Sequence, residues 1–176
     1  MKEFLVVVDM QKDFVDGSLG TAEAQAIVPR VAETIRRFDG RVFVTLDTHG
    51  TDYLSTSEGR HLPVAHCIKG TPGWQLDGAI AAALEGKDVV VLEKPTFGSL
   101  ELVEQLRRAA NGEAFAVTLV GLCTDICVVS NALLLKANFY EQTVRVDAAC
   151  CAGVTPQTHR AALETMRMCQ IELENA

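Results

Sequence analysis

The sequence lacks an excess of basic residues, and it lacks an apolar run long enough to cross a membrane. Its 176 residues include 16 lysines and arginines against 23 aspartates and glutamates, a formal net charge of −7. Proteins that neutralise nucleic-acid phosphates need a basic surface, so this balance argues against nucleic acid as a partner. The first apolar stretch offers about six positions before Asp9, whereas a membrane helix needs about 20. We therefore expect a cytoplasmic protein with no membrane partner.

The cysteines lack the C-x-x-C spacing of a thioredoxin-like redox motif. The chain is of ordinary size and rich in apolar residues, unlike a short secreted scaffold held by disulfides. Reduced thiols are therefore expected at all six positions, which are Cys67, Cys123, Cys127, Cys150, Cys151 and Cys169.

Short valine-rich runs alternate with helical patterns along the chain. Near-continuous apolar runs are typical of strands buried on both faces of a parallel sheet. The runs are residues 4–10, 41–47, 88–94, 115–121 and 143–149, and the helical patterns are residues 27–38, 78–86, 102–112 and 126–139. A loop after Asp147, a last helix capped by Thr155 with Pro156 behind it, and a short sixth strand in CQIEL complete the map. The alternation predicts a single α/β doubly wound domain over residues 1–176.

One segment interrupts the alternation. Residues 48–76 carry clustered polar side chains, four glycines and two prolines without a sustained period. A connection of this length is uncommon inside a compact domain, so we expect it to serve the function.

Reactive side chains stand where the expected strands end. Ligands of open parallel sheets bind outside the carboxyl ends of the strands, near the point where the strand order reverses. Taken singly, each residue is explained as a helix cap, a turn residue or a solvated lysine, and only the combination predicts a site. The residues are Asp9, Asp47, His49, Lys94, Cys123 and Cys127.

The stretch GLCTDICVV (121–129) contains two thiols, which the expected start of a helix separates. If Thr124 or Asp125 caps a helix that begins near Ile126, Cys127 falls in the first turn. There the unpaired backbone N–H groups and the helix dipole favour the thiolate, which is the nucleophilic form. Cys123 precedes the cap, so its side chain gains less.

Asp9 and Lys94 would supply what a lone thiol lacks. The Asp9 carboxylate can accept the thiol proton and later deliver it to a leaving group, and Lys94 favours developing negative charge. The backbone N–H groups of Cys123 and Cys127 would form an oxyanion hole.

Three blocks of the sequence resemble the signature blocks of the isochorismatase-like cysteine hydrolases, the family that includes nicotinamidases. They are DMQKDF (9–14), EKPTFGS (93–99) and GLCTDICV (121–128), in the family's order and spread over nearly the whole chain. The resemblance implies a catalytic triad of Asp9, Lys94 and Cys127, and a cis peptide between Leu122 and Cys123. It also implies a Rossmann-like three-layer α/β/α fold with a six-stranded parallel sheet.

The resemblance also gives the irregular segment a reading as a metal site. Its ligands, carried over by position, are Asp47, His49, Glu58 and His66. This nitrogen and oxygen set is suited to Zn²⁺, and Fe²⁺ or Mn²⁺ would also be accepted. His61 remains an alternative to Glu58. The competing interpretation is an ordinary loop with a turn cap and solvated side chains.

The activity that the resemblance implies is cleavage of a small-molecule amide, above all nicotinamide, to the acid and ammonia through a thioester. Phe14 and Phe97 would stack on a flat ring, although core aromatics look the same in a sequence. The chain departs from some nicotinamidases because LPVA (62–65) stands where they carry a tryptophan. The alternatives are a hydrolase of N-carbamoyl or other small amides, and a catalytically silent binding or scaffold protein. A homo-oligomer is expected by the same resemblance.

Overall fold

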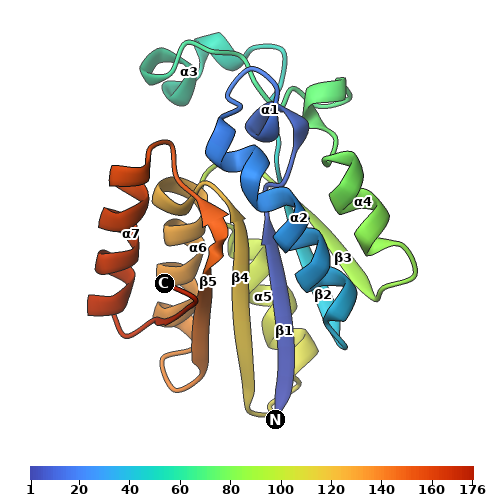
Figure 1. Cartoon of the computed structure of the whole chain (residues 1–176), viewed down its shortest axis with the longest axis vertical. Helices are drawn as coiled ribbons and strands as arrows, with labels where there is room; N and C mark the ends of the chain where they lie inside the picture. Colours follow the sequence, from blue (N-terminus) through green and yellow to red (C-terminus); the bar gives the residue numbers. More distant parts are fainter.

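A single parallel sheet of six strands forms the centre of the computed structural model, which describes residues 1–176 (Figure 1). The strand order is β3-β2-β1-β4-β5-β6, so the chain winds outward in one direction from β1 and in the other from β4. This order confirms the doubly wound α/β fold and the sixth strand. The strands are β1 (Lys2–Val8), β2 (Arg41–Asp47), β3 (Val89–Lys94), β4 (Phe115–Leu122), β5 (Thr143–Ala152) and β6 (Glu172–Glu174).

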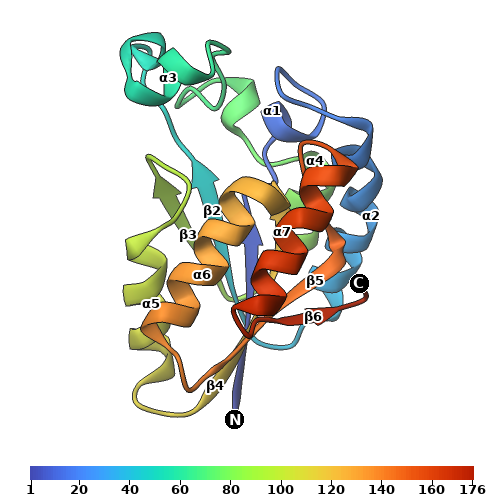
Figure 2. The ribbon, with the colours of Figure 1, turned by 90° about the vertical axis from the view of Figure 1, so that its left-hand side faces the viewer.

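Helices cover both faces of the sheet, as Figure 2 shows in a view turned by 90°. One face carries α1 (Lys12–Val15), α2 (Ala22–Arg37) and α4 (Gly78–Leu84), and the other carries α5 (Leu100–Ala110), α6 (Val129–Asn138) and α7 (Pro156–Met168). Alternate residues of a strand point to opposite faces. In β1, accordingly, Phe4 and Val6 enter the core under α5 to α7, while Leu5 and Val7 enter the core under α2 and α4. Burial on both faces explains the continuous apolar runs.

Among the element boundaries that differ from the expectation, three have a clear structural reason. The strand expected over residues 4–10 ends at Val8, because Asp9 has a φ of 48° that an extended strand does not allow. Helix α2 begins at Ala22 and not at residue 27, because the Thr21 side chain accepts a hydrogen bond from the Ala24 N–H and caps the helix. The prediction of a loop directly after Asp147 is also wrong, since β5 continues to Ala152.

The extension of β5 depends on an irregularity in its pairing with β4. Leu119 pairs with Val146, and the next regular pair is Gly121 with Cys151, so β5 advances five residues while β4 advances two. A sequence pattern cannot reveal such a bulge, because the extra residues break the period of two that marks a strand. The last helix begins as expected, with the Thr155 side chain accepting from the Thr158 N–H and Pro156 in the first position.

The turn that carries the second thiol is a single π-helical turn, η3 (Thr124–Val128), and not the first turn of an α-helix. Its N-cap is Cys123, whose carbonyl accepts hydrogen bonds from the N–H groups of Ile126 and Val128. Neither Thr124 nor Asp125 caps the turn, so that prediction is wrong. Their side chains bind elsewhere: Thr124 Oγ1 contacts His159 Nδ1 at 2.8 Å, and the Asp125 carboxylate accepts from the Val154 N–H.

The segment of residues 48–76 lies beyond the carboxyl ends of the strands. It contains η1 (Tyr53–Ser55), α3 (Ser57–His61) and η2 (Pro72–Trp74), and isolated bridges join His49 to Ile68 and Gln11 to Leu76. In Figure 1, α3 stands above the sheet at the end where the strand arrows point. The excursion therefore covers the edge of the sheet where reactive side chains were expected. No helix of the structure is long and apolar enough to span a membrane.

Gly121 gives a prediction about the stability of this edge. It has a φ of 118°, and a Cβ at this position would lie 2.2 Å from the Val8 carbonyl oxygen of the neighbouring strand. We expect Gly121→Ala to lower the free energy of unfolding by roughly 3–5 kcal/mol through backbone strain and overpacking. Gly112 is the matched control, because it also has a positive φ of 79° but nothing lies within 4 Å of its added Cβ.

For Gly112→Ala the expected loss is about 1–2 kcal/mol, from the backbone conformation alone. Urea titration of both variants measures the difference. Equal losses would show that the close approach to Val8 does not constrain the fold.

Candidate active site

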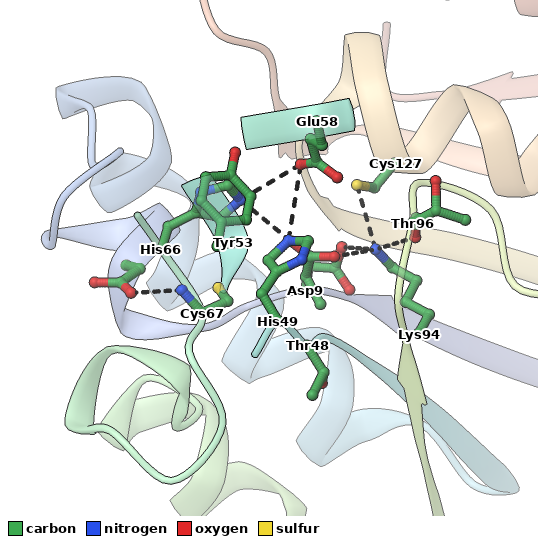
Figure 3. A network of polar contacts seen from close by, with 12 residues as sticks. Asp9, Thr48, His49, Tyr53, Glu58, His66, Cys67, Lys94, Thr96 and Cys127 are labelled. Carbon is green, nitrogen blue, oxygen red and sulfur yellow. Dashed lines mark hydrogen bonds and ion pairs between the residues drawn. The ribbon is translucent and has the colours of Figure 1, made fainter. Parts of the chain in front are cut away.

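The ends of four neighbouring strands bring the expected triad together. Asp9 follows β1, Lys94 is the last residue of β3, and Cys127 lies in the turn after β4 (Figure 3). Asp47, the last residue of β2, pairs with Lys94 in the sheet register. Because all four strands are parallel and adjacent in the order β3-β2-β1-β4, their carboxyl ends share one edge.

Lys94 is the centre of this arrangement. Its side chain is 1 % exposed, and its Nζ lies 2.6 Å from Asp9 Oδ2, 3.3 Å from Asp47 Oδ1 and 3.4 Å from Cys127 Sγ. It also donates to the Thr96 carbonyl oxygen at 3.0 Å. Burial opposes the charged form, but the negative groups around Lys94 outweigh it and raise its pKa. Lys94 is therefore a buried ammonium that faces the thiol.

Asp9 is completely buried, and Thr45 Oγ1 donates to its Oδ1 at 2.6 Å. Burial raises the pKa of Asp9, the nearby Lys94 lowers it, and the net shift is upward. Asp9 Oδ2 forms the ion pair with Lys94 but accepts no hydrogen bond of good geometry. This oxygen therefore keeps capacity to accept a proton.

Cys127 is 5 % exposed, and burial followed by the neighbouring Asp9 carboxylate raises its thiol pKa, with Lys94 opposing. This direction opposes the resting thiolate that the helix dipole was expected to favour. Cys123 also has a raised pKa, about 12, because of burial and then Asp125. The ammonium of Lys94 distinguishes the two thiols, since its hydrogen bond is to Cys127. The peptide bond between Leu122 and Cys123 is cis, as expected.

Four side chains beside the triad form a group that could hold a metal ion. One ligand atom from each of Asp47, His49, Glu58 and His66 lies within 4.8 Å of every other. His49 Nε2 and His66 Nε2 lie 2.9 and 3.4 Å from Asp47 Oδ2, and each lies 3.7 Å from Glu58 Oε1 (Figure 3). Two imidazole nitrogens and two carboxylate oxygens are a set that zinc and similar divalent ions accept. The residues present therefore fit a metal.

His61 does not join this group. It is exposed, and its Nδ1 contacts the Ser57 carbonyl oxygen at 2.8 Å within α3. Glu58 stands in the same short helix but points to the histidine pair, with its Oε1 3.7 Å from each ring. Between these two alternatives, the geometry favours Glu58 as the fourth ligand.

Two residues that the sequence did not single out, Gln11 and Tyr53, hold the metal-ligating group in place. Gln11 is fully buried, donates to the Asp47 carbonyl oxygen at 2.8 Å and accepts from the Asp47 N–H at 2.8 Å. The ring of Tyr53 lies 4.8 and 4.9 Å from those of His49 and His66. His66 Nδ1 contacts the Val64 carbonyl at 2.8 Å, so its Nε2 is the nitrogen directed at the cluster. Gln11 stands inside the DMQKDF block and could have been suspected, whereas no sequence signal points to Tyr53.

A cavity of about 190 Å³ lies between the thiol and the metal-ligating group. Both expected ring-stacking residues line it: Phe14 is buried and packs 5.4 Å from the His66 ring, and Phe97 is 41 % exposed. Leu62, from the LPVA stretch, also lines it. Residues that the sequence reasoning did not single out complete the wall. They are Leu19, Thr21, Ala24, Leu122, Ile126, Gly153 and Val154.

The fold and these residues define a hydrolase of the isochorismatase type, and the comparison with known families agrees. Residues 3–175 match the isochorismatase domain family, and the chain belongs to it. A nicotinamidase/pyrazinamidase of Mycobacterium tuberculosis is 32% identical over 186 aligned residues, covering 96% of each chain.

Two solved structures extend the comparison. The pyrazinamidase of Pyrococcus horikoshii in complex with zinc is 28% identical, with a TM-score of 0.82 over 98% of each chain. The N-carbamoylsarcosine amidase of Thermoplasma acidophilum is also 28% identical, with a TM-score of 0.75 over 99% of this chain and 96% of that one. The expected Rossmann-like three-layer fold is thereby confirmed.

The metal-ligating group leads to a prediction on metal content. We expect the purified protein to hold about one equivalent of a divalent metal, and His49→Ala or Glu58→Gln to lower the metal content, because each removes one of four donors. His61→Ala is the matched control from the same segment and should retain the metal. Elemental analysis after gel filtration measures the content. Loss of metal in His61→Ala but not in Glu58→Gln would show that His61, and not Glu58, is the fourth ligand.

Proposed function

We propose that the protein hydrolyses nicotinamide to nicotinate and ammonia through a thioester on Cys127. The observation that carries the proposal is the cavity, because Cys127 lines it together with Asp47, Glu58 and His66 of the metal-ligating group. A planar amide bound there meets the thiol at its carboxamide and the metal-ligating group at its ring. The Mycobacterium tuberculosis relative carries the name of this activity.

The first half of the proposed reaction forms the thioester. Cys127 Sγ attacks the carboxamide carbon as its proton passes to the Asp9 carboxylate. The tetrahedral intermediate then collapses, the C–N bond breaks, and the amide nitrogen leaves as ammonia with the proton from Asp9. The raised pKa of Asp9 makes its carboxylate a stronger base for this proton. The raised pKa of Cys127 means that the thiol gives up its proton as the C–S bond forms and not beforehand.

The second half releases the acid. Water attacks the thioester carbon while Asp9 accepts its proton, the C–S bond breaks, and Cys127 regains a proton. Lys94 stays charged and stabilises the negative sulfur as it forms, and the backbone N–H groups of Cys123 and Cys127 are the proposed donors to the oxyanion. In the first half the thiol proton passes through Asp9 to ammonia. In the second half a water proton passes through Asp9 back to Cys127.

The proposed ligands of the metal are Asp47, His49, Glu58 and His66, with Gln11 fixing the backbone of Asp47. A divalent ion held there would supply a Lewis acid toward a pyridine-type ring nitrogen. Phe14 and Phe97 are the proposed walls for the ring. Zinc is the proposed ion, since a zinc-bound relative has the same fold, and iron or manganese would suit the same donors.

An N-carbamoyl compound is the second candidate substrate, and the likeness to an N-carbamoylsarcosine amidase favours it. N-carbamoyl amino acids carry a carboxylate, which needs a cationic partner when it is buried. No lysine or arginine lines the cavity, while Asp47 and Glu58 do. Apart from the proposed metal, the lining therefore offers no positive charge to a carboxylate, which favours a neutral amide. A silent binding protein is disfavoured because the Asp9, Lys94 and Cys127 contacts are intact.

The single domain over residues 1–176, the cytoplasmic location and the homo-oligomer stay predictions. A small amide is the proposed partner, with neither nucleic acid nor membrane among the expected ones.

The test of the substrate is ammonia release from a panel of amides. We expect turnover of nicotinamide and pyrazinamide, which are flat and neutral, and little turnover of N-carbamoylsarcosine at equal concentration. Selectivity toward the carbamoyl compound would transfer the function to the second candidate. No ammonia from any member, with metal bound, would favour the silent binding protein.

The test of the nucleophile uses the two thiols of one turn. We expect Cys127→Ala to abolish ammonia release from nicotinamide, because the thiol that contacts Lys94 and Asp9 is lost. Cys123→Ala should retain most of the activity, since only its backbone N–H takes part in the proposal. Steady-state kinetics of both variants, checked for folding by circular dichroism, decide the assignment, and equal losses would contradict it.

A further inference from the structure

A buried asparagine outside the proposed triad connects the turn of the nucleophile to the loop that follows Lys94. Asn131 lies on α6, four residues after Cys127, and its side chain is fully buried. Its Nδ2 donates to the Cys127 carbonyl oxygen at 2.8 Å and to the Phe97 carbonyl oxygen at 3.1 Å, and its Oδ1 accepts from the Ser99 N–H at 2.9 Å. Two of these three bonds leave the helix and bind the loop of residues 95–99.

That loop holds two groups of the site. Lys94 Nζ donates to the Thr96 carbonyl oxygen at 3.0 Å, so the loop backbone sets the position of the ammonium. Phe97 lines the cavity and is 41 % exposed, and its own side chain therefore does little to fix the loop. The loop ends at Ser99, whose Oγ caps α5 by accepting from the Leu102 N–H at 3.1 Å. The bonds from Asn131 thus hold the loop at Phe97 and Ser99, on the far side of Thr96 from Lys94.

We propose that Asn131 is a positioning residue of the reaction, which fixes the loop of residues 95–99 against α6 so that Lys94 stays on Cys127. The proposal rests on the proposed function for its catalytic consequence. The side-chain amide is suited to the task because it supplies two donors and an acceptor in one plane. A buried apolar residue would leave the Phe97 carbonyl and the Ser99 N–H unpaired, and an aspartate could not donate to either carbonyl.

A serine at position 131 distinguishes the hydrogen bond within the helix from the two hydrogen bonds to the loop. Serine hydroxyls in helices bond the carbonyl four residues earlier, and Ser130 already does so with the Ile126 carbonyl at 2.6 Å. Asn131→Ser can therefore keep the bond to the Cys127 carbonyl, while it is too short to reach the loop. Asn138→Ser is the matched control, because Asn138 donates only to the Leu134 carbonyl of the same helix, at 2.9 Å, and is exposed.

The first measurement is steady-state kinetics with nicotinamide, at a temperature well below the thermal unfolding midpoint of each variant. We expect Asn131→Ser to bind its metal and to lose about 10–100-fold in kcat, since small misplacements of a reacting pair have effects of this size. Asn138→Ser should match the parent. A purely structural role would lower the unfolding midpoint and leave kcat unchanged.

The second measurement needs no substrate. The rate of Cys127 alkylation by iodoacetamide, followed by peptide mass spectrometry, rises with pH as the thiol ionises. Because the Lys94 ammonium favours the thiolate, its displacement in Asn131→Ser should slow alkylation about tenfold at a fixed pH, which corresponds to about one pKa unit. In a Lys94→Ala background the same substitution should not slow alkylation further.

These outcomes separate the proposal from the proposed function. If the parent does not hydrolyse nicotinamide, the alkylation profile alone decides the role of Asn131. A folded Asn131→Ser with the parent's kcat and the parent's alkylation rate overturns it, and so does further slowing of alkylation in the Lys94→Ala background. If Asn131→Ser does not fold, Asn131→Ala provides the same two readouts, because it also lacks both bonds to the loop.

Discussion

The buried ion pair between Lys94 and Asp9 is the interaction on which the site depends. Both side chains are at most 1 % exposed and lie 2.6 Å apart. Removing an ammonium from water is costly unless opposite charges surround it, and Lys94 has Asp47 as a second partner at 3.3 Å. The same cation contacts the Cys127 sulfur. One buried charge therefore ties three strand ends and the turn after β4 to a single point, and it connects the proposed triad with the proposed metal ligands through Asp47.

The balance of charge around Lys94 gives a physical reason for a metal. Asp9, Asp47 and Glu58 with Lys94 carry a formal charge of −2 in a largely buried region, and the two histidines add none when neutral. Burial raises the pKa of Asp47, but the neighbouring His49 and His66, together with Lys94, outweigh it and lower this pKa well below its usual range. A divalent cation beside Asp47 and Glu58 would neutralise the set. The chemistry of the donor atoms and the net negative charge thus both favour a divalent metal ion at this position.

The fold was predictable from the sequence to the extent that burial leaves a pattern. Valine-rich runs in the sequence predicted the strands that are covered on both faces. Thr155 with Pro156 predicted the start of α7. The extension of β5 and the early end of β1 were not predictable, because a bulge and the left-handed backbone of Asp9 arise from tertiary pairing. For the site, strand ends and motif blocks indicated Asp9, Lys94 and Cys127. Tyr53 and Asn131 carry no motif, and only their contacts reveal them.

The protonation of Cys127 depends on burial and on neighbouring charges that local reasoning from the sequence leaves out. A helix N-terminus favours a thiolate when its surroundings are solvated or positive. Here the thiol is buried beside two carboxylates, and one ammonium does not offset both, so ionisation by loss of a proton to water would deepen a buried negative charge. Transfer of that proton to Asp9 leaves the total charge of the site unchanged. The surroundings that make a free thiolate unfavourable thus favour a proton held between Cys127 and Asp9, which is the transfer that the proposed amide cleavage uses.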